Sequence, residues 1–310
     1  MSAGVKALES PLGRMGVRTV DYVTLLKPEL TGLSVLTALF GAFLAQTGGF
    51  ELRPLLVVLA GTLMVGGGAG TLNQFIERRE DSLMKRTERR PLPSARIQPA
   101  EALLFGSALS IAGVLLLAIA GTLFAGMVAF VTSTSYLFLY TPLKKYTPAA
   151  TFIGGIPGAL PPVIGWTAVR TDLGIEPVLL FLILFAWQMP HFYSLAWMYR
   201  KDYQRAGFSI LTVSDTTGRN TARRMVLYSA LLVALGPVTF AAGMTSVLSF
   251  SVTLFLGAGL LVLSWMFLRN TGSRESEERQ KSMNAIARRI FFASLVYIPV
   301  LILAISADRV

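Results

Sequence analysis

Three oxygen-bearing side chains recur at intervals of four residues where a Gly-rich apolar segment ends. They are Asn73, Glu77 and Asp81. On an α-helix with about 3.6 residues per turn, residues four apart lie along one face, so one amide and two carboxylates point the same way. Oxygen ligands of this kind suit Mg²⁺, which commonly bridges one or two carboxylates to substrate phosphates. The spacing therefore indicates a magnesium site.

Basic side chains follow this face directly, at Lys85, Arg86, Arg89 and Arg90. Cations at these positions could hold the phosphate oxygens that a metal leaves uncovered. An acidic face beside a basic stretch thus suggests a Mg²⁺-diphosphate site. The alternative is an ordinary loop of a membrane protein, whose cations orient the chain and whose carboxylates are solvated. The spacing alone favours the solvated loop, so the choice between the two interpretations depends on other features of the sequence.

The composition is that of an integral membrane protein. Of 310 residues, 53% are hydrophobic and only 15% are charged, which departs strongly from a soluble domain. The absence of cysteine excludes disulfides, a thiolate nucleophile and cysteine metal sites. The net charge of +11 is explained by basic loops beside apolar spans, so we expect no nucleic-acid partner. The segment from Met1 to Lys27 has no apolar core followed by a small-residue cleavage site, so we expect no secretory signal.

The apolar segments predict an all-α bundle of nine transmembrane helices around a central cavity. A span needs about 20 mostly apolar residues. The division near Gly121 is the least defined, because no charged loop separates the helices on either side of it. The predicted spans are 29–48, 54–76, 100–119, 121–140, 148–168, 176–198, 224–244, 246–268 and 287–306.

The basic residues predict the orientation of these spans. Nine spans place 25 of the 28 Lys and Arg residues on one side and leave only Arg53, Arg170 and Arg309 on the other. Because cytoplasmic loops carry the excess of Lys and Arg, the N-terminus is predicted to be cytoplasmic and the C-terminus to lie outside. The chain then divides into a cytoplasmic segment 1–28, one transmembrane domain 29–306 and a short tail 307–310.

The fifth span is predicted to be a distorted helix. Its glycines and prolines are enough to kink a helix and to let neighbouring helices approach closely. Broken helices in membranes tend to line cavities, where their exposed backbone groups find partners. A kinked packing helix without a ligand is an equally good interpretation. The residues concerned are Gly154, Gly155, Pro157, Gly158, Pro161, Pro162 and Gly165.

A second group of charges follows the sixth span, on the side where the first group emerges. It contains Arg200, Lys201 and Asp202, with Asp215 further along. Its carboxylates could form a second cation site facing the first one, or they could be solvated loop charges. The sequence does not separate these two interpretations.

The chain has one histidine, His191, within the sixth span and directly after Pro190. Polar groups inside a span are costly and therefore draw attention. His191 could bind a haem iron, carry a proton, or form a hydrogen bond with Gln188 or a neighbouring helix. From the residues alone, the hydrogen-bonding role is favoured.

Taken together, these motifs resemble those of the UbiA-type intramembrane prenyltransferases along nearly the whole chain. The first superfamily motif, N-x3-D-x3-D, matches Asn73, Glu77 and Asp81, with glutamate at the middle position. The second, D-x3-D, is absent as such, so the later loop supplies one carboxylate, Asp202. The stretch 81–92 and the pair 96–97 are similar to the D-x2-M-x-R-T-x2-R-P-L run of the branch that acts on haem, and Ala95 stands where a glycine is usual.

Three later segments extend the resemblance. Residues 140–144 resemble Y-T-x-x-K, residues 187–192 resemble W-Q-x-P-H-F, and residues 201–203 resemble K-D-Y. The resemblance implies transfer of a farnesyl group from farnesyl diphosphate to a vinyl group of haem b. Addition of water completes the reaction and gives haem o and diphosphate. It also implies a place in the cell inner membrane, an active site on the cytoplasmic side, and a haem a synthase or oxidase-assembly partner.

The resemblance further assigns roles to residues of this chain. Mg²⁺ and catalysis are assigned to Asn73, Glu77, Asp81 and Asp202. Substrate binding is assigned to Arg86, Arg90, Lys144, Lys145, Arg200, Lys201, Tyr140 and His191.

Two other functions remain open at this point. A sister prenyltransferase that acts on a quinone or chlorophyll precursor would share the diphosphate site. A transporter, in contrast, should carry its ionisable residues near the middle of the membrane. Glu77, Asp81 and Asp202 fall instead at the ends of spans, which argues against transport.

Overall fold

The computed structural model describes residues 11–272 and 277–308, and this part of the chain contains helices and no strands. Lys6, Arg274 and Arg309, which entered the count of basic residues, lie outside the described residues. The helices are α2 (Pro11–Leu25), α3 (Pro28–Ala45), α4 (Leu52–Ile76), α5 (Arg78–Ser82), α6 (Pro99–Leu116), the π-helix η1 (Leu117–Gly121), α7 (Leu123–Thr134), the π-helix η2 (Ser135–Tyr140), α8 (Thr141–Leu143), α9 (Ala150–Ala159), α10 (Pro161–Val169), α11 (Ile175–Met198), α12 (Arg200–Arg205), α13 (Leu211–Ser214), α14 (Arg219–Ala241), α15 (Val247–Arg269) and α16 (Glu277–Ala307).

Within the described residues, nine helical stretches are long and apolar enough to cross a membrane. This confirms the prediction of an all-α bundle with nine spans. The seventh and ninth helices begin earlier than predicted, at Arg219 and Glu277, because each continues beyond its apolar part. The stretches are Pro28–Ala45, Leu52–Ile76, Pro99–Gly121, Leu123–Leu143, Ala150–Val169, Ile175–Met198, Arg219–Ala241, Val247–Arg269 and Glu277–Asp308.

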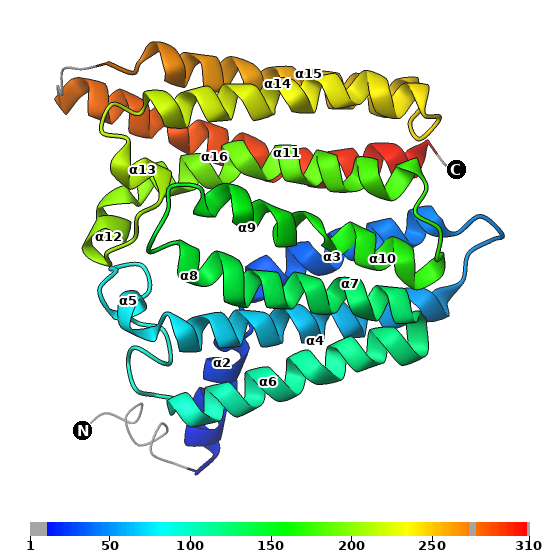
Figure 1. Cartoon of the computed structure of the whole chain (residues 1–310), viewed down its shortest axis with the longest axis horizontal. Helices are drawn as coiled ribbons and strands as arrows, with labels where there is room; N and C mark the ends of the chain where they lie inside the picture. Colours follow the sequence, from blue (N-terminus) through cyan, green and yellow to red (C-terminus); the bar gives the residue numbers. More distant parts are fainter. Residues whose placement is uncertain (1–10, 273–276, 309–310) are drawn as a thin grey trace.

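The long helices run side by side, and the short helices α5, α12 and α13 gather at one end of the bundle (Figure 1). This end, at the left of the view, carries the loops that follow α4 and α11. The prediction that the two charged loops emerge on the same face is therefore confirmed. We refer to this end as the loop end.

Helix α2 was not predicted, because its sequence has no long apolar stretch. It runs across the loop end beneath α4 (Figure 1). Two ion pairs hold it there. Asp21 accepts a hydrogen bond from Arg96 Nε at 2.9 Å, and Arg18 pairs with Glu101 at 2.9 Å. The chain passes from α2 through Lys27 directly into α3.

Glycine permits the closest helix contact in the bundle, between α3 and α10. A Cβ atom on Gly41 would lie 2.0 Å from the Pro162 carbonyl oxygen, and one on Gly165 would lie 1.7 Å from the Ala38 carbonyl oxygen. Neither position can hold a larger residue without separating the helices. Small residues at such crossings let the two backbones meet and gain dispersion contacts.

The fifth span is interrupted, as its prolines predicted. Helix α9 ends at Ala159 and α10 begins at Pro161, with Leu160 between them. The third and fourth spans separate at Thr122, whose hydroxyl accepts a hydrogen bond from the backbone N–H of Ala125 and caps α7. The predicted division near Gly121 is confirmed.

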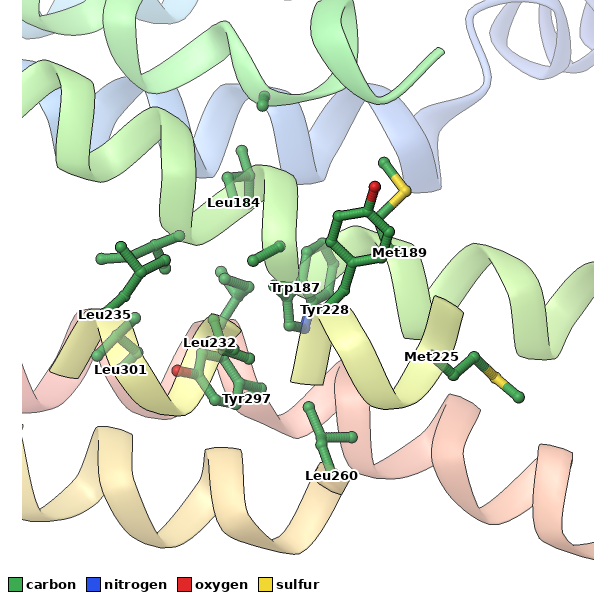
Figure 2. Packing of buried hydrophobic residues seen from close by; sticks show 14 of the residues in the cluster. Leu184, Trp187, Met189, Met225, Tyr228, Leu232, Leu235, Leu260, Tyr297 and Leu301 are labelled. Carbon is green, nitrogen blue, oxygen red and sulfur yellow. The ribbon is translucent and has the colours of Figure 1, made fainter. Parts of the chain in front are cut away.

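The largest hydrophobic core joins α11 to α14, α15 and α16 (Figure 2). Figure 2 shows Trp187 of α11 beside Tyr228 of α14. These helices are packed by large side chains. Leu184 and Trp187 of α11 belong to this core and also line the cavity described below.

Candidate active site at the loop end

Asn73, Glu77 and Asp81 occupy three successive helical turns where α4 passes into α5. The Glu77 N–H donates to the Asn73 carbonyl at 2.9 Å, and the Asp81 N–H donates to the Glu77 carbonyl at 2.8 Å. The three residues therefore share one face, as their spacing predicted. All three are buried, with at most 4% of their surface exposed.

Basic side chains from later segments neutralise the two carboxylates. Arg90 Nη1 lies 2.8 Å from Asp81 Oδ2, and Lys144 forms an ion pair with Glu77. Burial by itself would lower the pKa of Lys144, but the Glu77 carboxylate outweighs it and the pKa of Lys144 is raised. Lys144 therefore stays an ammonium ion.

Lys27 also contacts this carboxylate and amide face. From the sequence it was expected only to contribute to the charge asymmetry that orients the chain in the membrane. Its Nζ donates to Asn73 Oδ1 at 2.5 Å. Burial, reinforced by the charge of Arg90, lowers the pKa of Lys27 to about 7. The backbone of Lys27 has a φ of 48°, a left-handed conformation that costs a non-glycine residue free energy and often marks functional sites. Lys27 and Asn73 are 46 residues apart in the sequence, so no local sequence pattern indicated that they are in contact.

Two further basic residues lie beside the carboxylate face. Lys145 Nζ lies 2.5 Å from Glu80 Oε1. The Arg86 guanidinium lies over the ring of Tyr199, 4.9 Å from its centroid, and donates to the hydroxyl of Tyr203 at 3.3 Å. Arg86 thus links the loop after α4 to the loop after α11.

A cavity of about 220 Å³ opens beneath this group and is bordered by Lys27 and Tyr140. Segments of α3, α4, α7, η2, α9, α10 and α11 line it, and its deeper wall is apolar, with Val65, Ile164 and Leu184. Both halves of the interrupted fifth span contribute to the wall. Of the two interpretations of that span, the structure supports the cavity-lining one.

The charged residues of the second loop point in different directions. Asp202 pairs with Arg205 in its own turn and is 15% exposed. The Arg200 guanidinium lies 4.5 Å from the ring centroid of Trp197 and donates to Asn284 Oδ1 at 3.4 Å, and Lys201 is exposed. Within the described residues, the ion-pair partner of Asp202 is Arg205, and the cations of the first loop form no ion pair with it.

Asp215 has a structural role. Its Oδ2 accepts a hydrogen bond from the backbone N–H of Thr221 at 2.7 Å, and its Oδ1 accepts one from Thr217 Oγ1 at 3.2 Å. The bond from Thr221 satisfies a backbone donor in the first turn of α14, which the helix itself leaves without a partner.

His191 lies between α11 and α16. Its ring is stacked on Trp187 and on Phe291, with centroid distances of 5.3 and 4.8 Å. Its Nδ1 lies 2.8 Å from Ser294 Oγ. A hydrogen bond to a neighbouring helix, one of the roles left open by the sequence, is thus present.

The donor set at the loop end fits Mg²⁺ together with a diphosphate better than it fits a bare ion. The amide oxygen of Asn73 and the carboxylates of Glu77 and Asp81 are buried and aligned. Within the described residues, no group of three carboxylates or histidines could hold a metal ion by themselves. Mg²⁺ commonly binds through one or two carboxylates and completes its shell with water and substrate phosphates.

This fold and site define a polytopic membrane protein with a buried cluster of charged side chains at the border of an apolar cavity. A model of the UbiA prenyltransferase family matches residues 34–296. The chain belongs to the UbiA prenyltransferase family. It is 38% identical to the protoheme IX farnesyltransferase of Koribacter versatilis, over 100% of this chain and 99% of that protein. It is 41% identical to the protoheme IX farnesyltransferase of Solibacter usitatus, over 93% of this chain and 98% of that protein.

Solved structures share the fold at low sequence identity. A digeranylgeranylglyceryl phosphate synthase structure superposes with a TM-score of 0.74 at 17% identity, over 93% of this chain and 98% of that one. A UbiA homologue from Archaeoglobus fulgidus bound to DMAPP and Mg²⁺ superposes with a TM-score of 0.59 at 16% identity, over 90% of this chain and 99% of that one. The arrangement of helices is therefore that of the family.

Proposed function

We propose that this protein transfers the farnesyl group of farnesyl diphosphate to a vinyl group of haem b, with addition of water, to give haem o and diphosphate. The observation that carries the proposal is the buried Asn73, Glu77 and Asp81 face, which Lys27 links to the border of an apolar cavity. An anionic head and an isoprenoid tail match these two surfaces. Similarity to protoheme IX farnesyltransferases over the full chain supports haem b as the acceptor.

The basic side chains of the first loop would hold the diphosphate. Lys27 is the best placed, because it borders the cavity and its partner in the structure is the neutral amide of Asn73. Lys144 and Arg90 can turn from their carboxylates toward phosphate oxygens. Arg86, Lys145, Arg200 and Lys201 complete a basic rim.

Asn73, Glu77 and Asp81 are the residues that would hold Mg²⁺. When bound, this ion supplies neutralisation of the negative charge that develops on the departing diphosphate. Asp202 uses Oδ1 in its ion pair with Arg205, and its second carboxylate oxygen could join the set.

The cavity keeps bulk water from the allylic cation left when the carbon–oxygen bond to diphosphate breaks. The rings of Tyr136 and Tyr140, whose centroids are 5.6 Å apart, line its upper wall and can stabilise the cation through their faces. The haem vinyl group then forms the new carbon–carbon bond. One water molecule captures the resulting cation and releases a proton to the diphosphate. The chain needs no nucleophile of its own.

The proton position on His191 supports its assignment to haem contact. The Ser294 hydroxyl donates to the Phe291 carbonyl at 2.6 Å, so it can only accept from His191 Nδ1. This arrangement favours the tautomer protonated on Nδ1, in which Nε2 would keep its lone pair for iron. We expect His191→Ala to weaken haem b binding in a spectroscopic titration, with the fold retained. An unchanged titration would remove His191 from the haem site.

Orientation and place in the cell are part of the proposal. The charge asymmetry puts the loop end in the cytoplasm, the membrane is the cell inner membrane, and a haem a synthase or oxidase-assembly protein would receive the product. A single-cysteine variant at exposed Lys85, labelled from each side of the membrane, tests the orientation. Labelling from the periplasmic side would reverse it.

The reaction itself is tested by incubating purified protein with Mg²⁺, farnesyl diphosphate and haem b and measuring the haems by mass spectrometry. We expect a product that carries one farnesyl group and one added water, and its formation should require Mg²⁺. Unmodified haem, together with prenylation of a quinone or chlorophyll precursor under the same conditions, would replace haem b with another acceptor.

A further inference from the structure

The side-chain amide of Asn73 is held by a directional chain of hydrogen bonds. Asn73 Nδ2 donates to Thr141 Oγ1 at 3.0 Å, and Thr141 Oγ1 donates to the Tyr136 carbonyl at 2.8 Å. Thr141 has no exposed surface, and Asn73 is 1% exposed. Water therefore cannot substitute for either bond, and each has a structural consequence.

The π-helix η2 places Thr141 for this contact. In η2 the backbone N–H of Thr141 bonds the carbonyl of Tyr136, five residues earlier. The Thr141 hydroxyl donates to the same carbonyl. Both donors of Thr141 thus point at one oxygen, and the side-chain oxygen is turned toward α4. Single π-turns of this kind are frequent at functional sites.

The hydrogen bonds from Asn73 through Thr141 to the Tyr136 carbonyl can run in only one donor-to-acceptor direction. A carbonyl can only accept, so the hydroxyl hydrogen of Thr141 is committed to Tyr136. Thr141 Oγ1 then has only acceptor capacity left, so it must face the NH₂ group of Asn73. The amide oxygen of Asn73 is consequently turned the other way, toward Lys27, whose Nζ lies 2.5 Å from it.

We propose that Thr141 is a positioning residue that keeps the oxygen of Asn73, and not its nitrogen, facing the metal and diphosphate. This inference rests on the proposed function, because it assumes that Asn73 serves a Mg²⁺-diphosphate. An amide flipped by half a turn would present two N–H donors to a cation. Loss of a partner that orients a metal ligand typically costs about 10- to 100-fold in metal affinity.

The test uses purified full-length protein, with Mn²⁺ as the probe for Mg²⁺ and inorganic diphosphate as the probe for the substrate head. Free Mn²⁺ is measured by electron paramagnetic resonance. Thr141→Val removes the acceptor at nearly constant volume, and Thr141→Ser keeps it. We expect the Val variant to raise the Kd for Mn²⁺ by about 10-fold or more and the Ser variant to bind like the unaltered chain. Equal binding by all three would overturn the inference.

A matched control separates positioning from packing. Thr167 of α10 is also a threonine without exposed surface, and its hydroxyl bonds the carbonyl of Val163 in its own helix. We expect Thr167→Val to leave Mn²⁺ binding unchanged. If it weakens binding as much as Thr141→Val does, the effect comes from general loosening of the bundle, and the assignment of Thr141 fails.

A second variant pair covers the possibility that Thr141→Val folds poorly. In an Asn73→Asp background both side-chain atoms that can face the metal are oxygens, so orientation no longer matters. Thr141→Ala should weaken Mn²⁺ binding in the Asn73 chain and have little effect in the Asp background. An equal loss in both backgrounds would contradict positioning. Failure of the unaltered chain to bind Mn²⁺ with diphosphate would contradict the proposed function instead.

Discussion

The buried ion pair between Glu77 and Lys144 gives the sharpest energetic prediction. The side chains are 6% and 11% exposed, so the pair is largely removed from water. Two unit charges about 4 Å apart attract by roughly 4 kcal/mol at an effective dielectric constant near 20. Removing one partner of a buried pair leaves the other charge uncompensated, which typically costs about 3–5 kcal/mol.

The neighbouring basic side chains make the loss of unfolding free energy different for the two single variants, Glu77→Gln and Lys144→Met. Glu77→Gln leaves Lys144 near Arg90, which is always charged, and near Lys27, whose pKa is lowered to about 7, so like charges face one another in a buried site. Lys144→Met leaves Glu77 with those same cations still close. We therefore expect Glu77→Gln to destabilise the protein by about 3–5 kcal/mol and Lys144→Met by less.

The assay is a double-mutant cycle on the free energy of unfolding in detergent, without added Mg²⁺ or diphosphate. In the double variant the buried charges disappear together, so we expect it to recover at least about 2 kcal/mol relative to the sum of the single losses. Strictly additive losses would refute the pairing. A double variant that is stable yet inactive would separate the contribution of the pair to folding from its contribution to the reaction.

Three further outcomes follow from single contacts. Ala95 has a φ of 56°, so Ala95→Gly should raise the unfolding free energy by roughly 0.5–1 kcal/mol, and a loss would show that the loop prefers alanine. Gly165→Ala places a Cβ 1.7 Å from the Ala38 carbonyl oxygen and should cost about 3 kcal/mol in the same measurement, whereas a neutral result would mean that α3 and α10 move apart freely. Asp215→Ala removes the acceptor for the Thr221 N–H and should cost about 1–2 kcal/mol while the Mg²⁺ dependence of turnover stays unchanged; an altered Mg²⁺ dependence would restore a metal role for Asp215.

The nine spans were predictable because each is an unbroken apolar stretch, and apolar length alone decides whether a helix can cross a bilayer. The break at Leu160 was predictable for a similarly local reason, since Pro161 removes a backbone donor and clashes with the preceding turn. The common face of Asn73, Glu77 and Asp81 followed from helical periodicity. Ala95 was marked only by resemblance, as a position where glycine is usual, and its positive φ gives the physical reason.

What the sequence could not supply is pairing across long separations. Lys27 meets Asn73, and Thr141 meets the same amide from the other side, because three helices converge at the loop end. No periodic pattern encodes such a meeting. The π-turn that aims Thr141 also has no compositional signature. The sequence left open whether the carboxylates of the second loop face the first loop. The ion pair of Asp202 within its own turn is a contact that only side-chain geometry reveals.

The path from α2 into Lys27 has a practical consequence for anyone trimming or tagging this protein. A cut at the apolar boundary, between residues 28 and 29, would remove only the first residue of the membrane helices and would still delete the Lys27 side chain from the border of the cavity. Because Asp21 is anchored to Arg96, traction on the amino-terminal helix would also be transmitted to the loop that carries Arg90. A shortened chain that inserts normally but turns over slowly should first be checked for its missing lysine.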